Sequence, residues 1–210
     1  MNYSDNAFAT MLLTMALSPN REEYARPYSV QEFRKLEEMV RASNLHQLGR
    51  LLNVDISGLM MYLGISEEEA YRVFTLLNRS VQLTYALENR LNEGIEVVTV
   101  YDENYPQRLA CRMRTCAPPF FYRCGASELL NQRAVAIVGI SGVKTTGEVR
   151  EGIERLVRDV VQLGYAVITG GELGVSRVAA NAVMQCGGTL VDILGGSMQE
   201  HIHSDGIAEM

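Results

Sequence analysis

The chain has 210 residues, of which 47% are hydrophobic and 21% charged, and its formal net charge is −6. This composition is that of an ordinary globular protein with one large domain or two small ones. No apolar run reaches the ~18 residues that a membrane span needs, and no basic residue precedes the first apolar stretch, so we expect a cytoplasmic protein without membrane attachment. The acidic balance argues against a dedicated nucleic-acid binder, which is usually basic.

The cysteines do not follow the pattern of a metal site. None of the four forms a C-x-x-C pair, and the three histidines are not spaced with them as co-ligands. We therefore expect no metal and no cofactor at these positions, and reduced, partly buried thiols in a reducing compartment. The residues concerned are Cys111, Cys116, Cys124 and Cys186.

Residues 1–90 show helical spacing of apolar side chains and no strand signal. Ser29 is a predicted N-cap, Gly64 a predicted C-terminal cap, and Ser66 with Glu69 a predicted capping box. We interpret this part as a small all-helical domain that resembles a SAM or helix-hairpin-helix module. Helices are expected at 1–18, from 29 onward, at 45–52, at 56–63, from 66 onward, and at 81–91 as a continuation or a new helix.

Some modules of that kind hold a DNA backbone, but the charges here favour another role. Arg50 and Arg72 stand near Asp55 and the acidic run 67–69. A helical packing or protein-contact domain fits this balance better.

The second part, residues 91–210, begins with strand signals and a local excess of arginine. Residues 95–101 are rich in β-branched side chains, and 120–122 form a second strand candidate after a proline-marked turn. A basic surface or an ordinary solvated one is consistent with the arginines. These are Arg108, Arg112, Arg114, Arg123 and Arg133, with only Glu128 among them.

The central stretch of this part is AVAIVGISGVKTTG at residues 134–147. It reads as a buried strand, a glycine turn and the start of a helix over 148–163. A second strand at 165–169, a second glycine turn, a helix over 175–186 and a third strand at 189–194 follow. This alternation predicts an α/β Rossmann-like domain with a parallel sheet and right-handed crossovers, in which both glycine turns meet at the ligand-binding edge.

Neither glycine turn matches a standard nucleotide motif. The first turn contains Lys144 and Thr145, but its second glycine is misplaced for G-x-x-x-x-G-K-[ST]. Glycines 139, 142 and 147 also fail the G-x-G-x-x-G spacing of a dinucleotide site. Two interpretations stay open, a generic anion cradle of backbone N–H groups, hydroxyls and a lysine, and a tight turn that only joins strand to helix.

The candidate binding residues come from both glycine turns and from the arginine-rich segment. No nucleophile–base–acid set emerges, so we predict a protein that is not an enzyme. His201 and His203 lie in a polar stretch that favours a solvated loop, and Glu172 reads as an exposed loop acid. The candidates for binding DNA or phosphate are Gly139, Ser141, Gly142, Lys144, Thr145, Gly170, Gly171, Gly174, Arg177, Arg112 and Arg114.

An ordered set of segments resembles the DNA-processing protein A family (DprA/Smf). The set consists of DENYPQRL at 102–109, APPFFYRCG at 117–125, the first glycine turn, TGGELGVS at 169–176, and the strand between the glycine pairs at 187–188 and 195–196. The resemblance implies an extended Rossmann fold after a helical module. It also implies single-stranded DNA binding in recombination and natural transformation, with a recombinase partner, self-association and no established enzymatic activity.

The chain departs from the family pattern where the family carries charge. The arginine of its first turn is missing, with Lys144 as a partial substitute, and the second turn has Leu173 and Ser176 in place of an arginine and an aspartate. Ala180 stands for the family's histidine, and Arg177 is a possible replacement cation. The resemblance also implies a domain that is shortened at its C-terminus. Fewer cations predict weaker binding, so two alternatives stay open, a nucleotide or phosphate ligand and a protein-interaction module without DNA.

Overall fold

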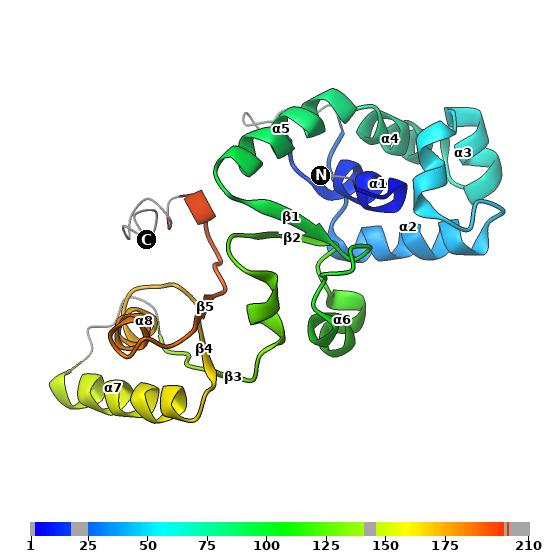
Figure 1. Ribbon diagram of the computed structural model, residues 1–210. Coiled ribbons are helices and arrows are strands. Elements are labelled where there is room, and N and C mark those ends of the chain that lie inside the picture. Colours follow the sequence, from blue (N-terminus) through cyan, green and yellow to red (C-terminus); the bar gives the residue numbers. More distant parts are fainter. Residues whose placement is uncertain (1–2, 18–24, 141–145, 200, 202–210) are drawn as a thin grey trace. The chain divides into compact units, whose positions relative to one another are not determined.

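The structure is a computed structural model that describes residues 3–17, 25–140, 146–199 and 201 (Figure 1). The chain divides into two compact units, Met1–Gly125 and Ala126–Met210, which we call the helical unit and the sheet unit. No helix in the described ranges combines the length and the apolar character that a membrane crossing requires.

The helical unit contains helices and one β-hairpin. Its elements are α1 (Asp5–Thr14), α2 (Val30–Ala42), η1 (Leu48–Asn53), α3 (Ile56–Leu63), α4 (Glu67–Leu77), α5 (Ser80–Asn92), β1 (Glu96–Thr99), α6 (Gln107–Met113), η2 (Arg114–Cys116) and β2 (Phe120–Arg123).

Short polar side chains cap the starts of α1 to α4, including the predicted caps at Ser29 and Ser66. Ser29 forms a full capping box with Glu32, and Gly64 ends α3 in the left-handed conformation at φ 63°. The box predicted at Ser66 is only half formed: its side chain accepts from the N–H of Glu69, but the Glu69 carboxylate instead accepts from Tyr28 Oη. Tertiary packing of α4 against the segment before α2 has redirected that carboxylate.

The hairpin of β1 and β2 belongs to the helical unit. The strands are antiparallel, and Val97, opposite Tyr122, is buried in the same hydrophobic core as the helices. Tyr3, just before α1, donates from Oη to the carbonyl of Val97 at 3.0 Å. The compact unit therefore extends to Gly125, beyond the boundary near residue 90 that the sequence predicts.

The sheet unit is a three-stranded parallel sheet in the order β3-β4-β5. Helices α7 and α8 pack on each other and on β4, so they cover one face of the sheet (Figure 1). This arrangement confirms the predicted Rossmann-like fold class. The elements are η3 (Ser127–Asn131), β3 (Ala134–Ala136), α7 (Gly147–Gln162), β4 (Ala166–Thr169), α8 (Val175–Gln185) and β5 (Leu190–Asp192).

The core of the sheet unit is made by small and β-branched side chains. They come from the inner face of the sheet and from the apolar stripes of α7 and α8, as the 3.6-residue spacing predicts. The buried members are Ile137, Val157, Val160, Val167, Ala179, Ala182 and Val183.

Candidate functional site

The first glycine turn begins in contact with the start of α8. A Cβ on Gly139 would lie 2.4 Å from the Cβ of Val175, closer than atoms can approach. Glycine is therefore required here for packing, a reason that the sequence pattern alone did not distinguish from ligand binding. The contact brings the end of the β3 segment next to the first turn of α8.

Two helices begin without a side-chain cap at the carboxyl edge of the sheet. Thr146 precedes α7 and Gly174 precedes α8, and neither residue caps its helix through a side chain. In the helical unit, α1 to α4 carry a serine or aspartate cap, whereas α5 and α6 also begin without a side-chain cap. An uncapped helix start presents free N–H donors and a positive dipole end, which suits an anion.

The second glycine turn connects β4 to α8 and carries most of the described candidates. Gly174 adopts φ 98°, a conformation that favours glycine, and a Cβ on Gly170 would meet only Ser176 Oγ, at 3.9 Å. Arg177 lies in the first turn of α8 and is half-buried. The backbone at Gly170 thus has room for a close ligand approach.

A polar cluster that the sequence did not predict lies at the ends of β4 and β5. Thr169 and Asp192 are paired in register, and the Thr169 hydroxyl donates to the Asp192 carboxylate. His201 Nε2 lies 3.3 Å from Asp192 Oδ2, and the two side chains are only 16% and 14% exposed. The prediction that His201 lies in a solvated loop is therefore wrong. An acidic residue within the otherwise largely apolar strand predicted at 189–194 was the available signal.

The chain after β5 packs onto the second glycine turn. Gly171 has φ 69°, and a Cβ there would lie 2.2 Å from Leu194 Cδ2 and 3.3 Å from His201 Cε1. Leu194 and His201 therefore cover Gly171, and its left-handed φ is the feature that favours glycine here.

The remaining predicted residues are divided between the two units. Arg112 and Arg114 are exposed at the end of α6 and the start of η2, in the helical unit. The glycines and Arg177 belong to the sheet unit. Ser141, Gly142, Lys144 and Thr145 lie outside the described residues.

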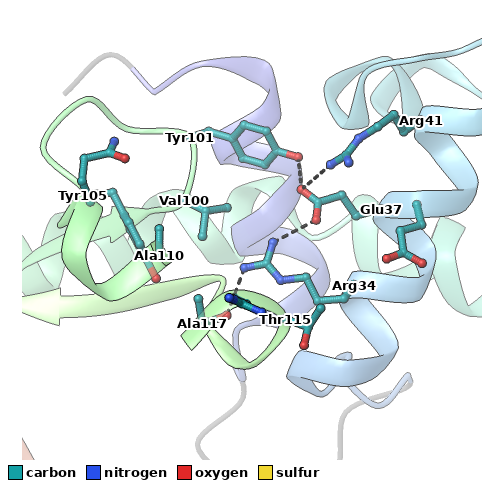
Figure 2. Close-up of a pocket in the computed structure, with 12 residues that line it drawn as sticks. Arg34, Glu37, Arg41, Val100, Tyr101, Tyr105, Ala110, Thr115 and Ala117 are labelled. Atoms are coloured by element: carbon teal, nitrogen blue, oxygen red, sulfur yellow. Dashed lines mark hydrogen bonds and ion pairs between the residues drawn. The ribbon is translucent and has the colours of Figure 1, made fainter. Parts of the chain in front are cut away.

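A pocket of about 450 Å³ lies within the helical unit, between α2 and the segment from β1 to η2 (Figure 2). Arg114 is the only one of the predicted binding residues in its described lining. The lining residues are Arg34, Glu37, Glu38, Arg41, Val100, Tyr101, Tyr105, Gln107, Ala110, Arg114, Thr115 and Ala117.

The pocket is organised by the carboxylate of Glu37, whose side chain is 11% exposed. Arg34 Nη1 donates to it at 2.9 Å, Tyr101 Oη donates at 2.6 Å, and Arg41 Nη2 lies 3.9 Å away (Figure 2). Burial, together with the bond to Glu37, raises the pKa of Tyr101, so its hydroxyl remains the donor. Arg34 also donates to the Ala117 carbonyl at 3.0 Å, which ties α2 to the segment before β2.

Arg114 lines the same pocket with an uncommon backbone. Its φ of 49° and ψ of −117° place a non-glycine residue at positive φ. Such conformations cost on the order of 1–3 kcal/mol and are concentrated at functional positions. The turn between α6 and η2 is therefore a candidate functional position.

The comparisons with known proteins agree with the predicted resemblance. The family model described as DNA recombination-mediator protein A matches residues 96–205, more than half of the chain. The chain belongs to this family. The family is described by a mediator role in recombination and not by a catalysed reaction.

The fold is also similar to a solved member. The X-ray structure of DNA processing protein A (DprA) from Streptococcus pneumoniae matches with a TM-score of 0.58 at 16% sequence identity. The match covers 95% of this chain and 60% of that chain, so this chain spans 60% of the relative's length. No match is found among curated proteins. The solved relative establishes the fold, whereas the family model establishes the family.

Proposed function

We propose that this protein binds single-stranded DNA and acts in DNA processing during recombination, including natural transformation. Family membership over residues 96–205 supports the general role. The observation that carries the binding proposal is the contact of Gly139 with Val175. It sets the first glycine turn beside an uncapped helix start at the ligand-binding edge of a parallel sheet.

In this proposal, backbone amides make the main contacts to phosphate. The N–H groups in the first turn of α8 approach one phosphate, and Arg177 supplies a guanidinium beside them. Such contacts do not read base identity, so we expect little sequence preference. A recombinase and a second copy of the chain are the partners that the family resemblance suggests.

The charge distribution predicts weak and salt-sensitive binding. The chain carries 19 basic and 25 acidic residues, and Asp192 lies at the same edge of the sheet. Its carboxylate is engaged by Thr169 and His201, which reduces its repulsion of a phosphate. Each phosphate contact should add about 0.7 to the slope of log K against log salt for a single strand.

Fluorescence anisotropy of a labelled oligothymidylate, titrated with the full chain at a series of salt concentrations, tests the proposal. Arg177→Gln should weaken binding, on the order of fivefold at low salt, and reduce the salt slope by about 0.7. Arg158→Gln removes the same charge from an exposed position near the C-terminal end of α7 and should change little. Absence of binding at the lowest salt concentration would refute the proposal.

The alternative of a nucleotide or phosphate ligand uses the same backbone donors. Thermal-shift measurements with mononucleotides, inorganic phosphate and an oligonucleotide separate it from the DNA proposal. The small-ligand alternative predicts that a mononucleotide or phosphate raises the melting temperature at least as much as the oligonucleotide does.

A further inference from the structure

We infer that the pocket between α2 and η2 in the helical unit is a second phosphate-binding site, which takes the phosphate of a nucleotide or of a DNA backbone. This site is separate from the sheet edge discussed above. The version of this inference in which the phosphate belongs to DNA rests on the proposed function. The version in which it belongs to a free nucleotide does not.

The first argument is the arrangement of charge. Three arginines and two glutamates line the pocket. Glu37 is occupied by Tyr101 and Arg34, so it acts as an internal support that holds the guanidinium of Arg34 in place. Arg41 is 70% exposed and only 3.9 Å from the same carboxylate, which leaves most of its donors for a ligand. Together with Arg114, the pocket presents more positive than negative charge to an incoming group.

The second argument is an unused hydrogen-bond donor. Arg34 Nε is buried, and no acceptor for it exists among the described residues. A buried donor without a partner costs about 1–3 kcal/mol, and water or an ion is its usual partner where protein atoms supply none. Arg79 and Arg123, outside the pocket, also carry buried nitrogens with no acceptor among the described residues. A phosphate oxygen that reaches the Arg34 guanidinium is an acceptor of the required polarity.

The third argument is the fit of size and chemistry. A volume of about 450 Å³ is within the range of small-ligand sites and exceeds what one phosphate requires. Guanidinium groups bind phosphate oxygens through paired N–H donors. The ring of Tyr101 and the amide of Gln107 line the remaining volume, which suits an attached sugar or base.

The fourth argument is the basic character of the adjoining helix. Arg108 and Arg112 are four residues apart on α6 and both are exposed, and Arg114 follows at positive φ. Arg108 and Arg112 do not line the pocket, but their positive charge on the adjoining helix makes the local potential more favourable for an anion.

Variants of the full chain in which one charged side chain or two are replaced by glutamine test the site. Loss of an arginine should weaken oligonucleotide binding, and loss of a glutamate should strengthen it. In anisotropy titrations with labelled oligothymidylate, the double variant Arg41→Gln/Arg114→Gln should bind on the order of tenfold more weakly at low salt. Glu38→Gln removes a carboxylate from the lining and should strengthen binding. Arg50→Gln, an exposed arginine of η1 outside the pocket, is the matched control and should change affinity less than about twofold.

A second readout follows the donor itself. The Arg34 Nε–H resonance, assigned with Arg34→Lys, should shift when AMP or inorganic phosphate is added to the wild-type protein. The same additions to the Arg41→Gln/Arg114→Gln variant should give a smaller shift. Circular dichroism of each variant confirms that it is folded before binding is compared.

The outcomes separate the two phosphate sources and the two proposals. Weakened oligonucleotide binding in the double variant supports a DNA-backbone phosphate, and an AMP-dependent shift without that weakening supports a free nucleotide. If the wild type does not bind oligonucleotide at all, the proposed function fails, and the Arg34 shift alone then decides this inference. Unchanged oligonucleotide binding together with an unshifted Arg34 resonance overturns it.

Discussion

Asp192 and His201 face each other at the carboxyl edge of the sheet, with His201 Nε2 3.3 Å from Asp192 Oδ2. The Asp192 carboxylate also accepts from the Thr169 hydroxyl, so one carboxylate joins β4, β5 and the segment after β5. The same segment places Leu194 over Gly171. Asp192 therefore brings a negative charge to the edge that we propose for phosphate, and Thr169 and His201 bind that carboxylate.

Removing that charge should strengthen DNA binding. Asp192→Asn keeps the shape of the side chain, and oligonucleotide affinity at low salt should rise roughly two- to fivefold, because the charge lies within a Debye length of about 10 Å from the proposed site. Asp159→Asn, exposed near the C-terminal end of α7, is the control and should have a smaller effect. An equal increase in both variants would mean that only net charge matters.

Two glycine-to-alanine substitutions should have opposite effects on stability. Gly139→Ala places a methyl group against Val175 and should destabilise the protein by about 1–3 kcal/mol, as overpacking does. Gly152→Ala lies inside α7, where a Cβ meets nothing within 4 Å, and should stabilise by about 0.5–1 kcal/mol through helix propensity. Urea unfolding monitored by circular dichroism measures both. If Gly139→Ala were tolerated as well as Gly152→Ala, the close packing of the turn against α8 would be contradicted.

Acid should remove the contribution of Glu32 to stability. Hydrogen bonding from Ser29, through its side chain and its backbone N–H, lowers the pKa of Glu32 to about 2. The folded state therefore favours the ionised form. The resulting stabilisation is complete above the unfolded pKa of about 4.3 and is lost as the pH falls through about 2.

The comparison of wild type with Glu32→Gln in urea at several pH values tests this. The wild type should be the more stable protein at pH 7, and the difference should shrink between about pH 4 and pH 2. A difference that stays constant over this range would show that Glu32 acts through shape or neutral hydrogen bonds instead.

Tyr101→Phe should destabilise the helical unit. The substitution removes the 2.6 Å hydrogen bond to the carboxylate of Glu37 and leaves that group with its arginine neighbours alone. Hydrogen bonds to charged groups contribute about 1.5–3 kcal/mol, which is the expected loss in the free energy of unfolding. Tyr85→Phe, 67% exposed on α5, is the control and should stay within about 0.5 kcal/mol of the wild type.

The local pattern predicted most elements because each depends on neighbours in sequence. The Ser29 cap, the left-handed Gly64, and the alternation of strand and helix after residue 134 are all confirmed. Backbone hydrogen bonding and side-chain periodicity act over a few residues, so the chain carries this information directly. The half-formed box at Ser66 shows the limit, because Glu69 is taken by Tyr28 from 41 positions away.

The candidate site was less accessible to prediction. The sequence placed both glycine turns at one edge but did not show that Gly139 touches Val175 or that Leu194 and His201 cover Gly171. The pocket around Glu37 was not predicted, since it combines α2 with a segment more than 60 residues later, as the 64-residue separation of Glu37 and Tyr101 illustrates.

Order and spacing of short segments were thus enough to indicate the fold class and the family of this chain, because strand, turn and helix signals are local and their succession restricts the topology. Which charges meet, which glycines are covered and where a pocket forms were decided only by the tertiary structure. Contacts such as Asp192 with His201 and Arg34 with Ala117 depend on how separate elements pack, and no periodicity along the chain encodes that packing.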